Sequence, residues 1–134
     1  MNARLHATVR RGDTDRVTAL IAAGADIDDQ DRYHQTALMN AARLGHTELV
    51  RALVMRGAAL NVTAKYRLTA LMLAIIGYHK EAACILIRAG ADLTVRGGKG
   101  AIGFYAKTAL DLAKERDLEQ VVTLLEQCAA PCGE

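Results

Sequence analysis

The chain has 134 residues, of which 51% are hydrophobic and 4% aromatic, and its formal net charge is +2. This length and composition fit one domain with a continuous core, and so small a charge argues against nucleic-acid binding. No apolar run reaches the length of a membrane span, and the N-terminus lacks the apolar region of a secretory signal, so we expect a cytoplasmic protein.

The first unit of the chain, residues 3–31, is expected to be an N-terminal cap. Asn2 can cap a helix that begins beside it, because its side chain can accept from free N–H groups at a helix N-terminus. Gly12 suits the turn to a second helix, since glycine readily takes positive φ. This unit lacks the threonine start of the later units, which fits a terminal position.

Two central units, residues 32–64 and 65–97, repeat the same markers at a period of 33 residues. Markers that recur at one fixed period predict a repeat protein in which each copy is one supersecondary unit. The markers are Thr36-Ala37-Leu38-Met39, which returns as Thr69-Ala70-Leu71-Met72; His46-Thr47-Glu48, which returns as His79-Lys80-Glu81; and the series Gly24, Gly57 and Gly90.

Each central unit is predicted to contain two short helices and an extended finger. Thr36 can cap the first helix, and Gly45 suits the turn that follows it. Leu49, Val50 and Leu53 then have the spacing of a second helix with one buried face. Because one helix pair cannot bury its own apolar face, stacked neighbours must complete the core. The sequence therefore predicts an all-α solenoid of helix-turn-helix units.

The fourth unit, residues 98–134, is expected to be a C-terminal cap with a lengthened finger. Its start, Thr108-Ala109-Leu110-Asp111, follows the third start by 39 residues, so six residues are inserted before it. Glu126 stands where the central units have the apolar Val54 and Ile87. A polar residue at such a position keeps the open end of a repeat stack soluble. All four units belong to a single domain, residues 1–134.

The segment from Thr36 to Val50 resembles the central signature of the ankyrin repeat family. Departures from the family pattern are Ala37, Ala70 and Ala109 for the usual proline, Met39 and Met72 for the usual histidine, and Tyr78 for the helix-separating glycine. The resemblance implies an ankyrin-repeat solenoid with β-hairpin or extended fingers. It also implies a non-enzymatic module that binds another protein as an adaptor, inhibitor or immunity-type partner.

The same resemblance implies a binding surface on the concave side, made of finger tips and first helices. The tips are about residues 28–35 (finger one), 61–68 (finger two) and 94–107 (finger three). The expected partner contacts on the fingers and first helices are Arg32, Tyr33, Gln35, Arg43, Leu44, Lys65, Tyr66, Leu68, Ile76, Arg96, Lys99, Ile102, Phe104, Tyr105 and Lys107.

Two alternatives stay open for the aromatic residues of the fingers. Aromatic side chains are strong interface anchors, because they offer a large contact area with few torsions to freeze. Tyr33 and Tyr66 could instead pack against the adjacent finger and steady it. Phe104 and Tyr105, in an insertion with four glycines, could either contact a partner or fold back onto the last unit.

Formal charge differs between the three fingers. Finger one has three aspartates against one arginine, a sum of −2; finger two has two cations, +2; and finger three has three, +3. A partner lying along the fingers would then carry complementary charge, basic near the first unit and acidic near the fourth. The alternative is that these charges only keep the surface soluble.

A second function is weighed because Gly98 to Gly103 matches the G-x-G-x-x-G pattern of nucleotide-binding loops. The next helix is expected only near Thr108, too far on for a phosphate to reach its N-terminus. His46 and His79 recur with the period, which indicates a structural role. We expect no catalytic residues, cofactor or metal. The expected partner is a protein, with no nucleic acid or membrane, and the free chain is expected to be monomeric rather than self-associated.

Overall fold

The computed structural model describes residues 2–99 and 106–129. These residues form eight α-helices and one short 3-10 turn, so the prediction of an all-α fold is confirmed. In chain order the elements are α1 (Ala3–Arg11), α2 (Thr14–Ala22), α3 (Ala37–Leu44), α4 (Thr47–Met55), η1 (Lys65–Arg67), α5 (Ala70–Ile76), α6 (Lys80–Arg88), α7 (Ala109–Glu115) and α8 (Glu119–Ala129).

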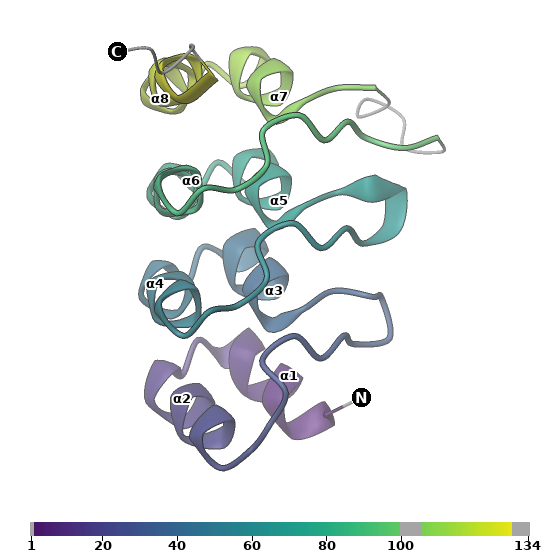
Figure 1. Cartoon of the computed structure of the whole chain (residues 1–134), viewed down its shortest axis with the longest axis vertical. Coiled ribbons are helices and arrows are strands. Elements are labelled where there is room, and N and C mark those ends of the chain that lie inside the picture. Colours follow the sequence, from purple (N-terminus) through teal and green to yellow (C-terminus); the bar gives the residue numbers. More distant parts are fainter. Residues whose placement is uncertain (1, 100–105, 130–134) are drawn as a thin grey trace.

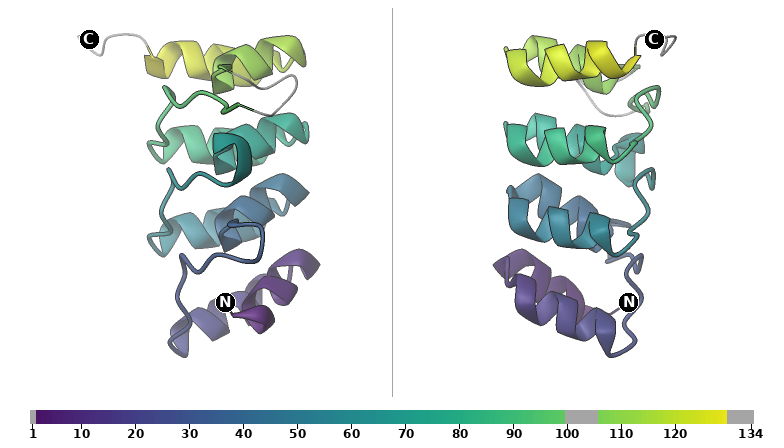
Figure 2. Two further views of the ribbon diagram at one scale, coloured as in Figure 1. Left: turned by 90° about the vertical axis from the view of Figure 1, so that its right-hand side faces the viewer. Right: turned by 60° about the vertical axis from the view of Figure 1, so that its left-hand side comes forward.

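The helices form four pairs that stack in one direction (Figure 1). The first helices α1, α3, α5 and α7 contact one another along one column, and the second helices α2, α4, α6 and α8 contact one another along the other. Two further views show the pairs as successive layers (Figure 2). The fingers project beside the column of first helices, so one side of the stack carries both (Figure 1).

Side-chain caps begin the first helix of every pair. The Thr36 hydroxyl accepts a hydrogen bond from the Met39 N–H at 3.2 Å, and Thr69 and Thr108 cap their own helices in the same way. The Asn2 side chain caps α1 by accepting from the Leu5 N–H at 3.0 Å. Each of these caps satisfies a helix N–H that has no partner within the helix.

All four turns between paired helices contain a residue with positive φ. Gly12 and Gly45 take φ of 72° and 78°, as glycine does without strain. The equivalent positions in the third and fourth pairs are Tyr78 and Asp117, with φ of 64° and 55°. The stack therefore imposes one turn geometry, and two side-chain-bearing residues accept it at a conformational cost.

The core runs through the whole stack between the two helix columns. Leucines and methionines fill it, and alanines such as Ala41, Ala74 and Ala113 are completely buried where neighbouring helices approach. Burial of this apolar surface is what stabilises each layer against the next. None of the helices in the described ranges is long and apolar enough to cross a membrane.

The fingers turn back through pairs of backbone hydrogen bonds. Within the described residues only Gly97 is in a strand-type bridge, so fingers one and two are tight turns rather than pairs of continuous strands. The closing bonds are Asp31 N–H to Gln35 O (2.9 Å), Ala64 N–H to Leu68 O (2.9 Å) and Gly97 N–H to Lys107 O (3.0 Å).

Candidate protein-binding surface

The ends of fingers one and two expose aromatic side chains. Tyr33 is 60% exposed and Tyr66 is 37% exposed, and the cations beside them, Arg32, Lys65 and Arg67, are exposed as well. Fingers one and two are neighbours on one side of the stack (Figure 1). Both tyrosines lie outside the core, as the repeat register predicted.

Asp31 anchors finger one from inside and is not a surface charge. Its side chain is 1% exposed and accepts hydrogen bonds from the Tyr33 N–H (2.8 Å), the Gln35 N–H (3.0 Å) and the Asn40 amide (3.1 Å). Burial alone would raise the pKa of Asp31, but these hydrogen bonds favour the carboxylate and lower it overall. The Arg10 guanidinium lies 3.8 Å from the carboxylate.

The other aspartates of finger one also serve the scaffold. Asp28 accepts from the Ala59 N–H of the next unit at 2.9 Å, and Asp29 accepts from the Asn2 N–H at 2.6 Å and contacts His6 at 2.9 Å. The bonds from Asn2 and His6 lower the pKa of Asp29. The sum of −2 expected for the tip of finger one is therefore wrong as a description of its surface, because Asp31 is buried and compensated.

The first helices add polar side chains that finger one holds in place. Arg43, near the end of α3, donates to the Asn40 side-chain oxygen Oδ1 at 3.0 Å and to the Gln35 side-chain oxygen Oε1 at 3.4 Å. This arrangement joins the finger to the last turn of α3. Leu44 is 36% exposed, whereas Ile76 of the next unit is half-buried and offers less surface than expected.

Leu68 is a correction to the predicted surface. It is only 8% exposed and belongs to the hydrophobic core, at the point where finger two returns to α5. Its counterpart Gln35 is half-buried and polar, so the repeat register alone placed Leu68 on the outside. Leu68 stabilises the fold and is not available to a partner.

Finger three has most of its described cations bound within the chain. Arg96 donates to the Ala106 carbonyl at 2.7 Å, and Lys107 forms an ion pair with Glu115 of α7. Lys99 is exposed. The formal charge of +3 therefore overstates what this finger offers a partner. The predicted contacts Ile102, Phe104 and Tyr105 lie outside the described residues.

The glycine-rich segment begins with N–H groups that are already used. The Gly97 N–H donates to the Lys107 carbonyl, and the Gly98 N–H donates to the Tyr66 carbonyl at 2.6 Å. A phosphate-binding loop needs such N–H groups free to point at the anion. Nothing in the described part of the segment favours the nucleotide-binding alternative.

One exposed aromatic residue near a helix turn, Tyr78, was missed as a candidate contact. Tyr78 is 62% exposed, and the Arg116 guanidinium lies 6.0 Å from the centre of its ring. Arg10 is about half-exposed (46%) beside the Asp31 network. The departure of Tyr78 from the family glycine was the signal in the sequence, but its pairing with Arg116 depends on the stacking of two units.

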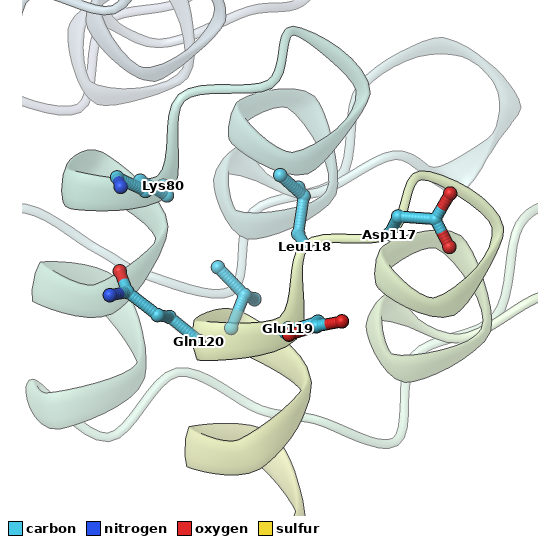
Figure 3. Close-up of a pocket in the computed structure, with 6 residues that line it drawn as sticks. Lys80, Asp117, Leu118, Glu119 and Gln120 are labelled. Atoms are coloured by element: carbon cyan, nitrogen blue, oxygen red, sulfur yellow. The ribbon is translucent and has the colours of Figure 1, made fainter.

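A pocket of about 220 Å³ lies where α6 meets the turn between α7 and α8. Figure 3 shows Lys80 and Asp117 on opposite sides of it, with the Asp117 carboxylate directed away from the Lys80 amine. These two charged groups do not point toward one another. Among the described residues, no cluster of three or more histidine, cysteine or acidic side chains could hold a metal ion.

Comparison with known proteins gives one match to a family model. The model described as ankyrin repeats (3 copies) matches residues 5–97, or 93 of the 134 residues. A search of curated proteins found no significant match.

Proposed function

The chain belongs to the ankyrin repeat family, whose repeats are generally protein–protein interaction modules, and we propose that it binds a partner protein on the finger side. The proposed surface consists of the predicted contacts without the buried Leu68. The observation that carries the proposal is the exposure of Tyr33 and Tyr66, with their neighbouring cations, on successive fingers. Large exposed aromatic side chains with adjacent arginines are typical of interface anchors.

A rigid base supports these exposed groups. The Asp31 network fixes finger one to α3, and the Gly98 N–H fixes finger three to finger two. Side chains on a preorganised backbone lose less conformational entropy on binding than side chains on mobile loops. This favours recognition by a preformed surface over folding on contact.

We also propose that the α7–α8 pair is a diverged fourth repeat that closes the stack. It packs on α5 and α6 as the earlier pairs pack on one another, although the family model ends at residue 97. A closing repeat keeps the core of the third repeat covered. An adaptor or an inhibitor would use the same surface, and the partner decides between these roles.

Affinity capture from cells that make the protein tests this proposal. The surface variant combines Arg43→Glu with Tyr66→Ala. The matched control combines Arg88→Glu on α6 with Met55→Ala on α4, since Met55 is exposed and both side chains belong to second helices. We expect the wild type and the control to retain the same partner and the surface variant to lose it at least about tenfold. Equal recovery by both variants would contradict the proposal.

A further inference from the structure

The turn at the end of finger two, Lys65-Tyr66-Arg67, has an unusual backbone. Tyr66 has φ of 65° and ψ of 20°, and Arg67 has φ of 57°. A two-residue turn with positive φ at both positions strongly favours Asn-Gly. Most other residues are strained there, because at positive φ the Cβ atom comes too close to the following carbonyl oxygen. In finger one only His34 has positive φ, and Tyr33, the counterpart of Tyr66, does not. Finger two therefore holds a strained turn with two large side chains.

Finger three, from the next unit of the stack, is hydrogen-bonded to this turn. The Gly98 N–H donates to the Tyr66 carbonyl at 2.6 Å. A Cβ atom on Gly98 would lie 3.2 Å from the Tyr66 carbonyl carbon and 3.3 Å from the Arg67 Cγ, so a larger residue would need the turn to shift by a few tenths of an ångström. The strained turn is thus linked to the next finger by a backbone hydrogen bond and by close packing.

The side chains of the turn form a positively charged, partly aromatic surface. The Lys65 ammonium lies 4.9 Å from the centre of the Tyr66 ring, and Arg67 is exposed beside it. Lys99, next to Gly98, is exposed too. Across residues 2–99 and 106–129, none of these three cations forms an ion pair, whereas Arg10 and Lys107 do.

We infer that the Lys65-Tyr66-Arg67 turn recognises an acidic segment of the partner protein. Carboxylates of the partner pair with Arg67, Lys65 and Lys99, and the Tyr66 ring supplies apolar contact area beside them. This inference rests on the proposed function and specifies the chemistry of the partner. A protein segment fits better than a nucleic acid, because the net charge is only +2 and the adjacent finger one carries Asp28 and Asp29.

The first test measures binding of labelled peptides by fluorescence anisotropy at low and moderate salt. The probes are a twelve-residue peptide of repeated Gly-Ser-Glu, its Gly-Ser-Gln and Gly-Ser-Lys counterparts, and a twelve-nucleotide oligothymidylate. We expect the Glu peptide to bind at least about tenfold more tightly than the Gln peptide, and salt to weaken it. Equal binding of the Glu and Gln peptides, or tighter binding of the oligothymidylate, would overturn the inference.

Charge-reversal variants then test where on the chain the acidic peptide binds. Lys65→Glu with Arg67→Glu should weaken binding of the Glu peptide at least about tenfold. Arg56→Glu, directly after the end of α4, with Arg88→Glu in α6 makes the same change in net charge at exposed positions and should leave binding within about twofold. If both pairs weaken binding equally, the effect belongs to overall charge and the inference is wrong.

The strain provides a second, independent test. Tyr66→Asn with Arg67→Gly puts the favoured turn sequence at the strained positions. We expect the melting temperature to rise by a few degrees while binding of the Glu peptide falls at least about tenfold. Retained binding would show that the side chains are not needed. A different result would contradict the proposed function. That result is equal capture of the natural partner by the surface variant and by its control.

Discussion

The imidazole Nε2 of His79 lies 3.0 Å from the backbone carbonyl oxygen of Arg43, which belongs to the preceding helix pair. His46 makes the same contact with the Arg10 carbonyl at 3.2 Å, so the link recurs between the first three pairs. At the junction of the third and fourth pairs the equivalent position is Leu118, which has no polar side-chain atom. The structural role predicted for the two histidines is confirmed.

Removing this link should weaken the stack. His79→Leu leaves the Arg43 carbonyl without its side-chain donor, and we expect the free energy of unfolding to fall by about 1 kcal/mol. His46→Leu should have an effect of similar size, because its contact is equivalent. Urea unfolding followed by circular dichroism measures both. Losses below about 0.3 kcal/mol for both variants would mean that these hydrogen bonds do not stabilise the layers.

Substitution by alanine should destabilise the protein to different extents at two glycines with similar φ. Gly45 has φ of 78°, and a Cβ atom there would press against the His79 ring. Gly57 has φ of 86°, but a Cβ atom would meet no heavy atom within 4 Å. We expect Gly57→Ala to cost about 1 kcal/mol from backbone strain alone, and Gly45→Ala about 1–3 kcal/mol more. Equal destabilisation by the two substitutions would show that the His79 ring moves aside freely.

Tyr78 should lower the stability of the fold, relative to glycine, at its position in the turn between α5 and α6. Its φ of 64° is unfavourable for a tyrosine, and its side chain is 62% exposed, so little burial is lost on removal. We expect Tyr78→Gly to raise the free energy of unfolding by about 0.5–1 kcal/mol. Asp117→Gly should gain less, since aspartate tolerates positive φ better. Thermal unfolding measures both; a loss of stability for Tyr78→Gly would indicate that the contact with Arg116 outweighs the strain.

The buried carboxylate of Asp31 should make stability depend on pH. Its folded-state pKa is lowered, so its contribution is fully present above the ordinary value of 3.8 and is lost as pH falls through the folded value. Asp31→Asn should cost about 1–3 kcal/mol at pH 7, and this difference should shrink below about pH 4. Asp15→Asn, at an exposed position of α2, is the control and should cost little at either pH. A difference for Asp31→Asn that stays constant with pH would contradict this assignment.

Much of the fold could be predicted because its signals are local. The threonine caps and the turn glycines act within one helix pair, and the 33-residue period multiplies each signal. The burial of Asp31 could not be predicted in this way, since its partners Arg10 and Asn40 come from two different units. One weak sign was present: the positions 33 residues after Asp31 and Asn40 hold the apolar Ala64 and Leu73, so this polar pair does not recur.

The candidate surface was predictable in outline and less so in detail. Exposure of Tyr33 and Tyr66 follows from their place on the fingers, because residues at a turn face solvent. Leu68 was misplaced because its register counterparts Gln35 and Lys107 are polar, and polar counterparts suggest an exposed position. The double positive φ at Tyr66 and Arg67 has no local sequence signal, because neither residue is the Asn or Gly that such a turn favours.

Hydrogen–deuterium exchange of the complex with the captured partner tests the central claim most directly, because it reports where the partner covers the chain. We expect new protection in the turns of fingers one and two, residues 31–36 and 64–69, and at the end of α3. The second helices α4 and α6 should exchange as in the free protein. Protection confined to α2, α4, α6 and α8, with fingers one and two unchanged, would contradict binding on the finger side.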